Sequence, residues 1–142
     1  VVTGTNKQGQ PVGMTANSFT SVSLQPPLIA WSVAQTATHF EDFIGSSRFA
    51  VHVLQQHQQA LASTFATRDI DRFADIAFEQ ASDGLPLLSD YLVRFTCVTD
   101  QVIAVGDHHM LFGKIEEVSQ QAGTPLIFAR GKFASLTAAA DQ

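Results

Sequence analysis

The sequence predicts a mainly β protein, an antiparallel β-barrel with α-helices packed on its outside. Two observations carry this prediction. Strand-like runs outnumber helix-like runs along the 142 residues. The connections between the runs are also too short for the helical crossovers that parallel strands require. A barrel is the simplest arrangement of many short antiparallel strands, because closure removes the open sheet edges.

The composition agrees with a compact protein. Hydrophobic residues make up 45% of the chain and charged residues only 15%, which suits a large buried surface. The length favours a single domain over residues 1–142, and no linker or internal repeat divides it. Eight Lys and Arg against thirteen Asp and Glu give a net charge of −5, without a basic run. A nucleic-acid partner is therefore not expected, because phosphates need a positive face.

The chain has one cysteine, Cys97, which lies in an apolar run. An inert buried thiol is expected there, and an internal disulfide is excluded. No apolar stretch reaches the ~20 residues of a membrane span. The first residues lack the basic part and the long apolar part of a secretory signal. A soluble, cytoplasmic protein is expected. Because the chain opens inside a strand, further residues are expected upstream.

The first part of the chain predicts a β-hairpin followed by a buried strand. Residues 1–5 are rich in β-formers, and residues 6–10 (NKQGQ) supply a turn. The return strand continues into residues 13–27 (GMTANSFTSVSLQPP), where apolar residues roughly alternate. Residues 28–33 (LIAWSV) are typical of a buried strand, and Trp31 is expected in the core.

A short helix is predicted next, with Thr38 as its N-cap. Glu41 stands three residues later, at the position of a capping box, and Gly45 follows as a helix stop. Residues 48–54 (RFAVHVL) then alternate as a strand does. Residues 55–66 have a helical composition.

The second half of the chain consists mainly of predicted strands. A further short helix over residues 70–77 precedes a turn at residues 83–86 (DGLP). The strands predicted after this turn comprise residues 91–99, 101–105, 110–118, 125–128 and a last short strand with Lys132 and Phe133. The tail from residue 137 to residue 142 is expected to fray.

Uncharged polar side chains gather in three stretches beside the apolar runs. Residues 13–27 carry many Ser, Thr and Asn residues and no charge, and residues 32–38 and 65–68 form two further patches. Such surfaces suit a flat, largely apolar ligand edged with hydrogen-bonding atoms. Thr36 and Thr38, at a predicted helix N-terminus, suit a phosphate. The residues alone leave a second interpretation open, that these are ordinary strand and cap residues.

Motifs for several other chemistries do not occur. The glycines near the start lie between strands rather than before a helix, so they form no phosphate loop, and there is no GxSxG motif. The five histidines do not have a metal-binding spacing with nearby carboxylates. The side chains of His108 and His109 would point to opposite faces of a strand and could not chelate one ion. No metal site is expected.

Seven segments follow one another in an order that resembles a known family. They are VVTGT, GMTANSFTSVSLQPPLIAWSV, AQTAT, SSRFAVHVLQQHQQALASTFA, DGLPLL, GDHHMLFGKIEEV and PLIFARGKF. Together they cover nearly the whole chain, and the second segment and the Asp-His pair are the most specific. The chain resembles the flavin reductase family of split-barrel flavoproteins, which includes the reductase components of two-component monooxygenases.

The resemblance implies a homodimeric, Greek-key-like split barrel that binds FMN or FAD near the subunit interface. It also implies an NAD(P)H-dependent flavin reductase, in which NADH or NADPH reduces the flavin by hydride transfer and the reduced flavin passes to a partner monooxygenase. An alternative of another class stays open. A flavin-binding, electron-transfer protein of the same fold would keep its flavin and lack reductase activity.

The resemblance also assigns site residues. The segments expected to contact the flavin comprise Thr15, Ala16, Asn17, Ser18, Ser32, Val33, Ala34, Gln35, Thr38, Phe65, Ala66 and Arg68. His108, in the family's Asp-His motif, is expected near the nicotinamide side of the flavin as the catalytic residue. Relatives often carry a Lys about where Gln35 stands, so Arg68 or Arg48 is expected to supply the missing cation. His52 is expected to face the subunit interface.

Overall fold

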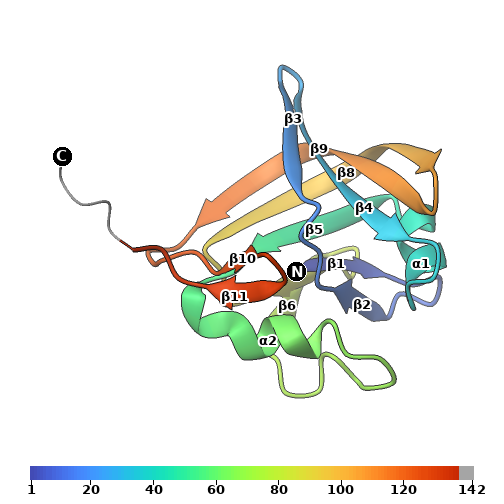
Figure 1. The fold of residues 1–142 in the computed structure, drawn as a ribbon. Coiled ribbons are helices and arrows are strands. Elements are labelled where there is room, and N and C mark those ends of the chain that lie inside the picture. Colours follow the sequence, from blue (N-terminus) through green and yellow to red (C-terminus); the bar gives the residue numbers. More distant parts are fainter. Residues whose placement is uncertain (138–142) are drawn as a thin grey trace.

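The computed structural model describes residues 1–137 and contains a seven-stranded antiparallel sheet (Figure 1). The strand order is β2-β1-β5-β8-β9-β4-β3. These strands comprise β1 (Val2–Thr5), β2 (Pro11–Met14), β3 (Thr20–Leu24), β4 (Pro27–Ala34), β5 (Arg48–Val53), β8 (Val93–Val105) and β9 (His108–Gln120). The prediction of a mainly β, antiparallel protein is confirmed. The predicted frayed tail and the end of the predicted domain, residues 138–142, lie outside the described residues.

One hydrophobic core joins the two ends of this sheet. Val12 of the edge strand β2 lies in the same cluster as Ile29 and Trp31 of β4, near the opposite edge. Trp31 is fully buried, as expected, and its ring meets Phe43 edge to face with the centroids 5.0 Å apart. The sheet therefore curls so that both edges face one core. Among residues 1–137 no ladder joins β2 to β3, so the curled sheet is open along this line, which we call the seam.

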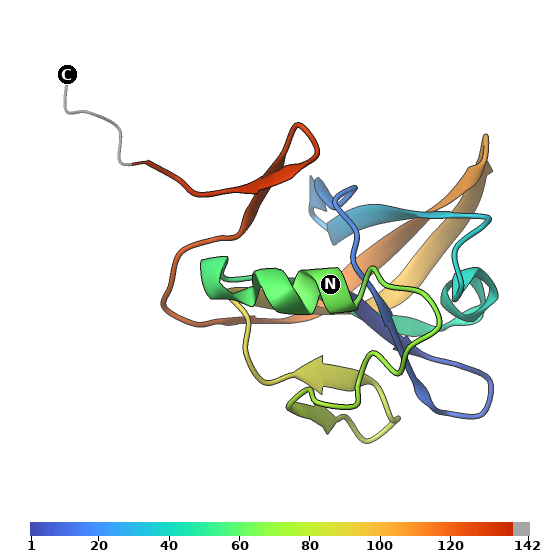
Figure 2. The same ribbon diagram turned by 60° about the horizontal axis from the view of Figure 1, so that its bottom comes forward.

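The remaining elements surround the curled sheet, and Phe43 of α1 enters its main core. They comprise α1 (Phe40–Gly45), the 3-10 turn η1 (Gln56–Gln58), α2 (Gln59–Thr64), β6 (Phe78–Gln80), β7 (Pro86–Leu88), β10 (Ile127–Ala129) and β11 (Lys132–Ala134). In the turned view, α2 lies in front, with the β10–β11 hairpin above it and the β6–β7 hairpin below it (Figure 2). Ala62 and Phe65, from α2 and its C-terminal end, pack in a second core cluster with Val1, Leu54 and Leu88.

The polar stretch 13–27 is not the continuous strand that its alternation predicts. Strand β2 ends at Met14, residues 15–19 form a loop, and β3 begins at Thr20. The ladder stops because Thr15 donates its N–H to the carbonyl of Phe65, beyond α2, rather than to a neighbouring strand. This partner lies far away in the sequence, so local alternation could not indicate it.

Helix α1 begins later than predicted, and Thr38 does not cap it. The N-cap position is His39, without a side-chain hydrogen bond to the backbone, and the predicted capping box with Glu41 does not form. A turn in which Ala37 donates to the carbonyl of Ala34 delays the helix. The ring of His39 instead lies 3.0 Å from the carboxylate of Asp42.

The helix predicted over residues 70–77 is wrong. This segment contains isolated turns, in which Ala74 donates to the carbonyl of Asp71 and Ile76 to that of Phe73. Asp69 has φ of 60°, a left-handed conformation that breaks any continuation from α2. Phe73 also packs against Phe65 in the second core cluster, with ring centroids 5.1 Å apart, so burial rather than helix formation shapes the segment.

Most strand predictions in the second half are confirmed, with changed boundaries. The separate strands predicted over 91–99 and 101–105 form the single strand β8, in which the pairing to β9 shifts register between Thr99 and Gln101. Such a bulge interrupts the alternation and explains the predicted break. The β6–β7 pair was not predicted, because strands of three residues show too little alternation.

Candidate functional site

The loop of residues 15–19 crosses the seam, because it joins β2 to β3, the two edge strands of the sheet. Its backbone is not paired in a ladder. Within residues 1–137, the N–H groups of Ala16, Asn17 and Ser18 donate to no protein acceptor. Asn17 and Ser18 are exposed. The seam therefore offers free backbone donors beside uncharged side chains, which suits a ligand with acceptor atoms.

Hydrogen bonds hold this loop from both sides. Thr15 donates its N–H to the carbonyl of Phe65 at 3.1 Å and its hydroxyl to the carbonyl of Ala62. The hydroxyl of Ser18 accepts from the N–H of Ser32 at 2.9 Å and donates to the carbonyl of Ser32 at 3.2 Å. The loop is thus anchored to α2 on one side and to β4 on the other.

The turn between β4 and α1 extends the polar surface. Arg68 donates from Nη2 to the carbonyl of Thr36 at 3.3 Å, which joins the segment after α2 to this turn. Gln35 donates its N–H to the carbonyl of Asp107 at 3.0 Å, which joins the turn to the β8–β9 connection. We call this surface the polar rim, which comprises residues 15–18, 32–38 and 66–68. Arg68 is its one charged side chain.

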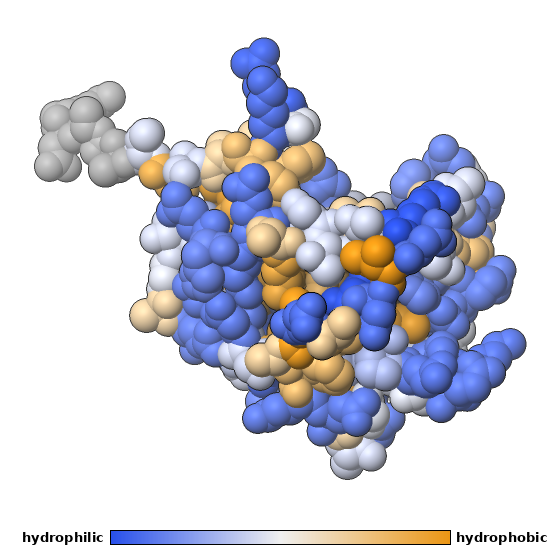
Figure 3. Space-filling model, turned by 90° about the horizontal axis from the view of Figure 1, so that it is seen from below, coloured by the Kyte–Doolittle hydropathy of each residue, from blue (hydrophilic) through white to orange (hydrophobic). Residues whose placement is uncertain are grey.

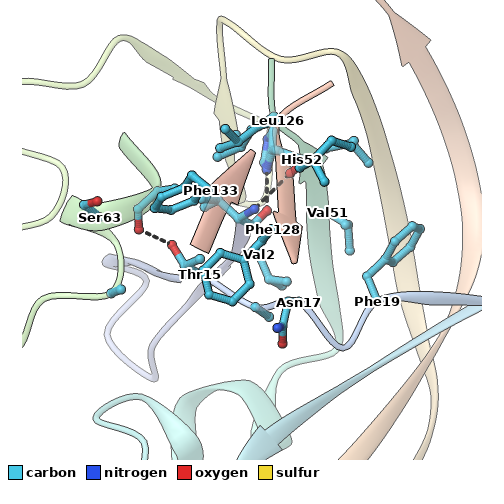
Figure 4. A pocket seen from close by; sticks show the side chains of 17 residues that line it. Val2, Thr15, Asn17, Phe19, Val51, His52, Ser63, Leu126, Phe128 and Phe133 are labelled. Carbon is cyan, nitrogen blue, oxygen red and sulfur yellow. Dashed lines mark hydrogen bonds between the residues drawn. The ribbon is translucent and has the colours of Figure 1, made fainter. Parts of the chain in front are cut away.

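A cavity of about 650 Å³ adjoins the polar rim (Figure 4). Thr15, Ala16 and Asn17 contribute to its wall, with aromatic rings such as Phe128 and Phe133, and among residues 1–137 no charged side chain lines it. In Figure 4, Phe19 and Ser63 lie on opposite sides of the cavity. Seen from below, apolar surface gathers at the centre of the molecule with polar surface around it (Figure 3). The volume and the lining are those of a site for a small, flat, neutral group.

His52 lies in the cavity wall and is buried within the chain, which contradicts the expectation that it faces a subunit interface. Its Nε2 accepts from the N–H of Leu88 at 3.1 Å, so Nδ1 carries the proton toward the carbonyl of Val1 at 3.2 Å. Burial lowers the pKa of His52 to about 3. The ring is therefore neutral, and its two nitrogens join β5 to β7 and to Val1, the residue before β1.

His108 stands at the start of β9, beside the polar rim. It pairs with Ala34 across the β4–β9 ladder. Its Nδ1 lies 2.7 Å from the carboxylate of Asp107, and its side chain is 45% exposed. This hydrogen bond holds the pKa of Asp107 below its ordinary value. With Nδ1 engaged by Asp107, Nε2 is left to face solvent or a ligand.

The predicted flavin contacts fall into three groups. Thr15, Ala16, Asn17 and Ala66 line the cavity. The side chains of the second group belong to the polar rim outside the cavity lining: Ser18, Ser32, Ala34, Gln35, Thr38 and Arg68. Val33 and Phe65 are fully buried in the core, so their side chains are out of reach of a ligand.

The structure distinguishes between the two arginines expected to replace the missing Lys. Arg48 binds the carboxylates of Asp83 at 2.6 Å and Glu116 at 3.1 Å, away from the polar rim. Its charge is already neutralised, and the expectation for Arg48 is wrong. Arg68 lies on the rim, so it is the cation that remains for an anionic ligand.

Sequence reasoning missed the far wall of the cavity. Val51 and Leu126, like the rings of Phe128 and Phe133, come from β5 and from the region of the β10–β11 hairpin, which lies next to α2 (Figure 2). Their aromatic and aliphatic character predicted core strands, and nothing local indicates that they surround an open space. Cys97 matches its prediction, because it is buried and burial raises the pKa of its thiol to about 12.

Among residues 1–137, no group of three or more His, Cys, Asp and Glu side chains is placed to hold a metal ion. No helix in this range has both the length and the apolar character needed to span a membrane.

Comparison with known proteins identifies the family of the chain. The family model described as "Flavin reductase like domain" matches residues 1–137. The chain is 39% identical over 133 residues to the FMN reductase (NADH) SmoA of Agrobacterium fabrum, covering 94% of this chain and 75% of that protein. It is 37% identical to the reductase component of the flavin-dependent trigonelline monooxygenase of Acinetobacter baylyi, covering 94% of this chain but only 43% of that protein.

Solved structures share the fold. The NADH:FAD oxidoreductase SgcE6 of Streptomyces globisporus, in complex with NAD and FAD fragments, superposes with a TM-score of 0.91 at 32% identity. The alignment covers 99% of this chain and 86% of SgcE6. The match of the family model over residues 1–137, together with these relatives, shows that the chain belongs to the flavin reductase family.

Proposed function

We propose that this protein is an NAD(P)H-dependent flavin reductase that reduces FMN or FAD and supplies the reduced flavin to a partner monooxygenase. One observation carries the proposal. An uncharged loop, whose N–H groups at Ala16, Asn17 and Ser18 have no acceptor among residues 1–137, crosses the seam and forms part of the wall of an apolar cavity. The names of the relatives support the same activity, since SmoA is an FMN reductase and the Acinetobacter protein is a reductase component.

The residues present fit a flavin. The ring system of a flavin is flat and largely apolar, with acceptor nitrogens and carbonyl oxygens along one edge, which matches free N–H groups at Ala16, Asn17 and Ser18. A charged wall would cost desolvation without a partner on the neutral ring, and the cavity wall has no charged side chain. A flavin nucleotide also carries phosphate, for which Arg68 is the available cation.

The protein's own contribution is positioning. The flavin, when bound, supplies the chemistry by accepting a hydride from the nicotinamide. The anchored loop holds its donors in fixed places, so little ordering remains to be done when the ligand arrives. His108, oriented by Asp107 at the start of β9 and beside the last residue of β4, would contact the nicotinamide or the flavin. No obligate general acid is assigned.

The assembly and the location are part of the proposal. The described strands would form a split barrel that pairs with a second copy as a homodimer, and residues 1–142 would be a single domain. The curled sheet with an open seam supports the split barrel, because its two edges face one core. A cytoplasmic location follows from the sequence expectation, and the partner monooxygenase is supported by the relative named as a reductase component.

A direct experiment tests the activity. The purified protein is assayed for oxidation of NADH and of NADPH with FMN, FAD and riboflavin added in turn. A colourless preparation that oxidises a nicotinamide nucleotide only when a flavin is added supports the reductase. A yellow preparation that is inert toward both nucleotides would instead support the second candidate, an electron-transfer flavoprotein.

A further inference from the structure

The segment that follows α2 carries two arginines without carboxylate partners. Among residues 1–137, Arg68 and Arg72 form no salt bridge, whereas Arg48 binds two carboxylates. The chain has a net charge of −5, so acidic side chains outnumber the cations available to them. Arg94 likewise binds a backbone carbonyl without a salt bridge among residues 1–137, so what distinguishes Arg68 is its exposed guanidinium on the polar rim, where an anionic ligand can reach it.

Arg72 ties this segment to the sheet. Its Nη1 donates to the carbonyl of Gly13 in β2 at 2.7 Å, and its Nε donates to the carbonyl of Thr67 at 3.0 Å. One rigid guanidinium thus spans the end of β2 and the start of the loop 67–72. Partial burial, with the nearby charge of Arg68 as the second cause, lowers the pKa of Arg72.

Arg68 reaches outward from the same loop. It is exposed, and Nη2 lies 3.3 Å from the carbonyl of Thr36 on the opposite side of the polar rim. Between the two arginines, Asp69 has φ of 60°, so the chain reverses sharply there. The direction of Arg68 therefore depends on the loop being closed, and the bond from Arg72 to Thr67 closes it.

Acidic residues on the same segment do not neutralise the pair. Asp71 directs one carboxylate oxygen to the N–H of Phe73 at 3.1 Å. Asp69 and Asp75, like Asp71, have no salt bridge with either arginine among residues 1–137. The guanidinium of Arg68 keeps N–H groups free for a phosphate.

We propose that Arg72 is a positioning residue that sets the preference of the site for phosphorylated flavins, by holding Arg68 at the polar rim. The inference rests on the proposed flavin reductase function. FMN differs from riboflavin only by its phosphate, so the ratio of their dissociation constants reports this end of the ligand alone. Arg68 contacts the phosphate, and Arg72 acts through the loop that carries Arg68.

Binding measurements with FMN and riboflavin test this role without relying on turnover. Dissociation constants are measured by quenching of flavin fluorescence for the wild type, Arg68→Ala, Arg72→Ala and Arg72→Lys, with Lys7→Ala as a control that removes an exposed charge from the β1–β2 turn. Loss of one charge-assisted hydrogen bond is expected to raise the Kd for FMN about tenfold in Arg68→Ala and to leave that for riboflavin unchanged. Arg72→Ala is expected to do the same, and Lys7→Ala to change neither.

The variant Arg72→Lys distinguishes a role of Arg72 in positioning the loop from a role of its positive charge. Lysine keeps the positive charge but has one nitrogen in place of Nε and Nη1, so it cannot reproduce both bonds at their two positions, and a positioning role predicts a loss similar to that of Arg72→Ala. A wild-type ratio in Arg72→Lys overturns the proposal, as does a wild type that binds FMN and riboflavin equally. Unchanged riboflavin binding and an unchanged melting temperature confirm that the variants fold. If the wild type binds flavin but oxidises no nicotinamide nucleotide, the proposed function fails while the ratio still tests Arg72.

Discussion

The hydroxyl of Ser18 bonds to both backbone groups of Ser32, accepting from its N–H at 2.9 Å and donating to its carbonyl at 3.2 Å. Strands β3 and β4 pair by backbone only from Thr20 and Ala30 onward. The Ser18 side chain thus takes the place of a further backbone pair, and the backbone N–H of Ser18 stays free. Ser18 is predicted to contact the flavin, and its hydroxyl also anchors the loop that crosses the seam to β4.

Replacing Ser18 with Ala is expected to raise the Kd for flavin about five- to tenfold, because two hydrogen bonds that order the loop are lost. The turnover number at saturating flavin should change less. Fluorescence titration and steady-state kinetics measure the two effects. Ser21→Ala, on the exposed strand β3, is the matched control, and an equal effect in both variants would contradict the role of Ser18.

Replacing His108 with Ala is expected to lower NADH turnover more than it lowers flavin affinity. The reason is its place at the start of β9, where Nδ1 bonds to Asp107 and, among residues 1–137, Nε2 has no partner. Steady-state kinetics, with the flavin Kd measured alongside, check this. His57→Ala is a close control, because His57 forms a similar exposed pair with Asp90 at 2.6 Å but lies outside the polar rim. Equal losses of turnover and flavin binding would remove His108 from its proposed role.

His52 is expected to make the fold sensitive to acid. Its pKa is about 3 in the folded chain and 6.5 when unperturbed. Between these two pH values the unfolded chain binds a proton at this residue and the folded chain does not. The free energy of unfolding therefore falls as the pH drops from 6.5 toward 3, by a few kcal/mol at most from this residue. Urea unfolding of the wild type and His52→Gln at about pH 7 and about pH 4.5 measures it. The variant should be less stable at neutral pH yet lose less on acidification; parallel losses would show that His52 is not responsible.

Gly13 is expected to tolerate no side chain. A Cβ at this position would lie 2.5 Å from the ring of Phe65, which is fully buried and cannot move aside. Gly13→Ala should reduce the free energy of unfolding by about 1–3 kcal/mol, as overpacking does. Gly45→Ala is the control, because open space surrounds its Cβ and its backbone is helical. Equal stability of the two variants in urea unfolding would contradict the packing argument.

Strands such as β4 and β5 could be predicted from the sequence because they are short runs of apolar and β-forming residues, and three consecutive residues of β4 and four of β5 are buried. The loop 15–19 could not, since its start is determined by the carbonyls of Ala62 and Phe65. The helix expected over 70–77 failed for a related reason: Phe73 is apolar because it packs on Phe65, not because it belongs to a helix face.

The candidate site could likewise be predicted in part. The composition of the three polar stretches indicates a ligand site, and the order of the segments along the chain indicates the family. Which of them meet depends on long-range bonds, such as Ser18 with Ser32 and Arg68 with Thr36. Arg48 differs from Arg68 because it binds Asp83 and Glu116. Both carboxylates lie far from Arg48 in the sequence, so no local pattern indicates these ion pairs.

The open seam has a thermodynamic consequence. Strands β2 and β3 are the two ends of one sheet, and the loop 15–19 is the covalent link across the gap between them. A molecule bound on that loop contacts both ends of the sheet, which no ladder joins among residues 1–137. Its binding therefore stabilises the closed arrangement of β2 and β3. Saturation with such a molecule raises the melting temperature by mass action and slows amide exchange first in β2 and β3. When such a molecule dissociates, this added stability is lost.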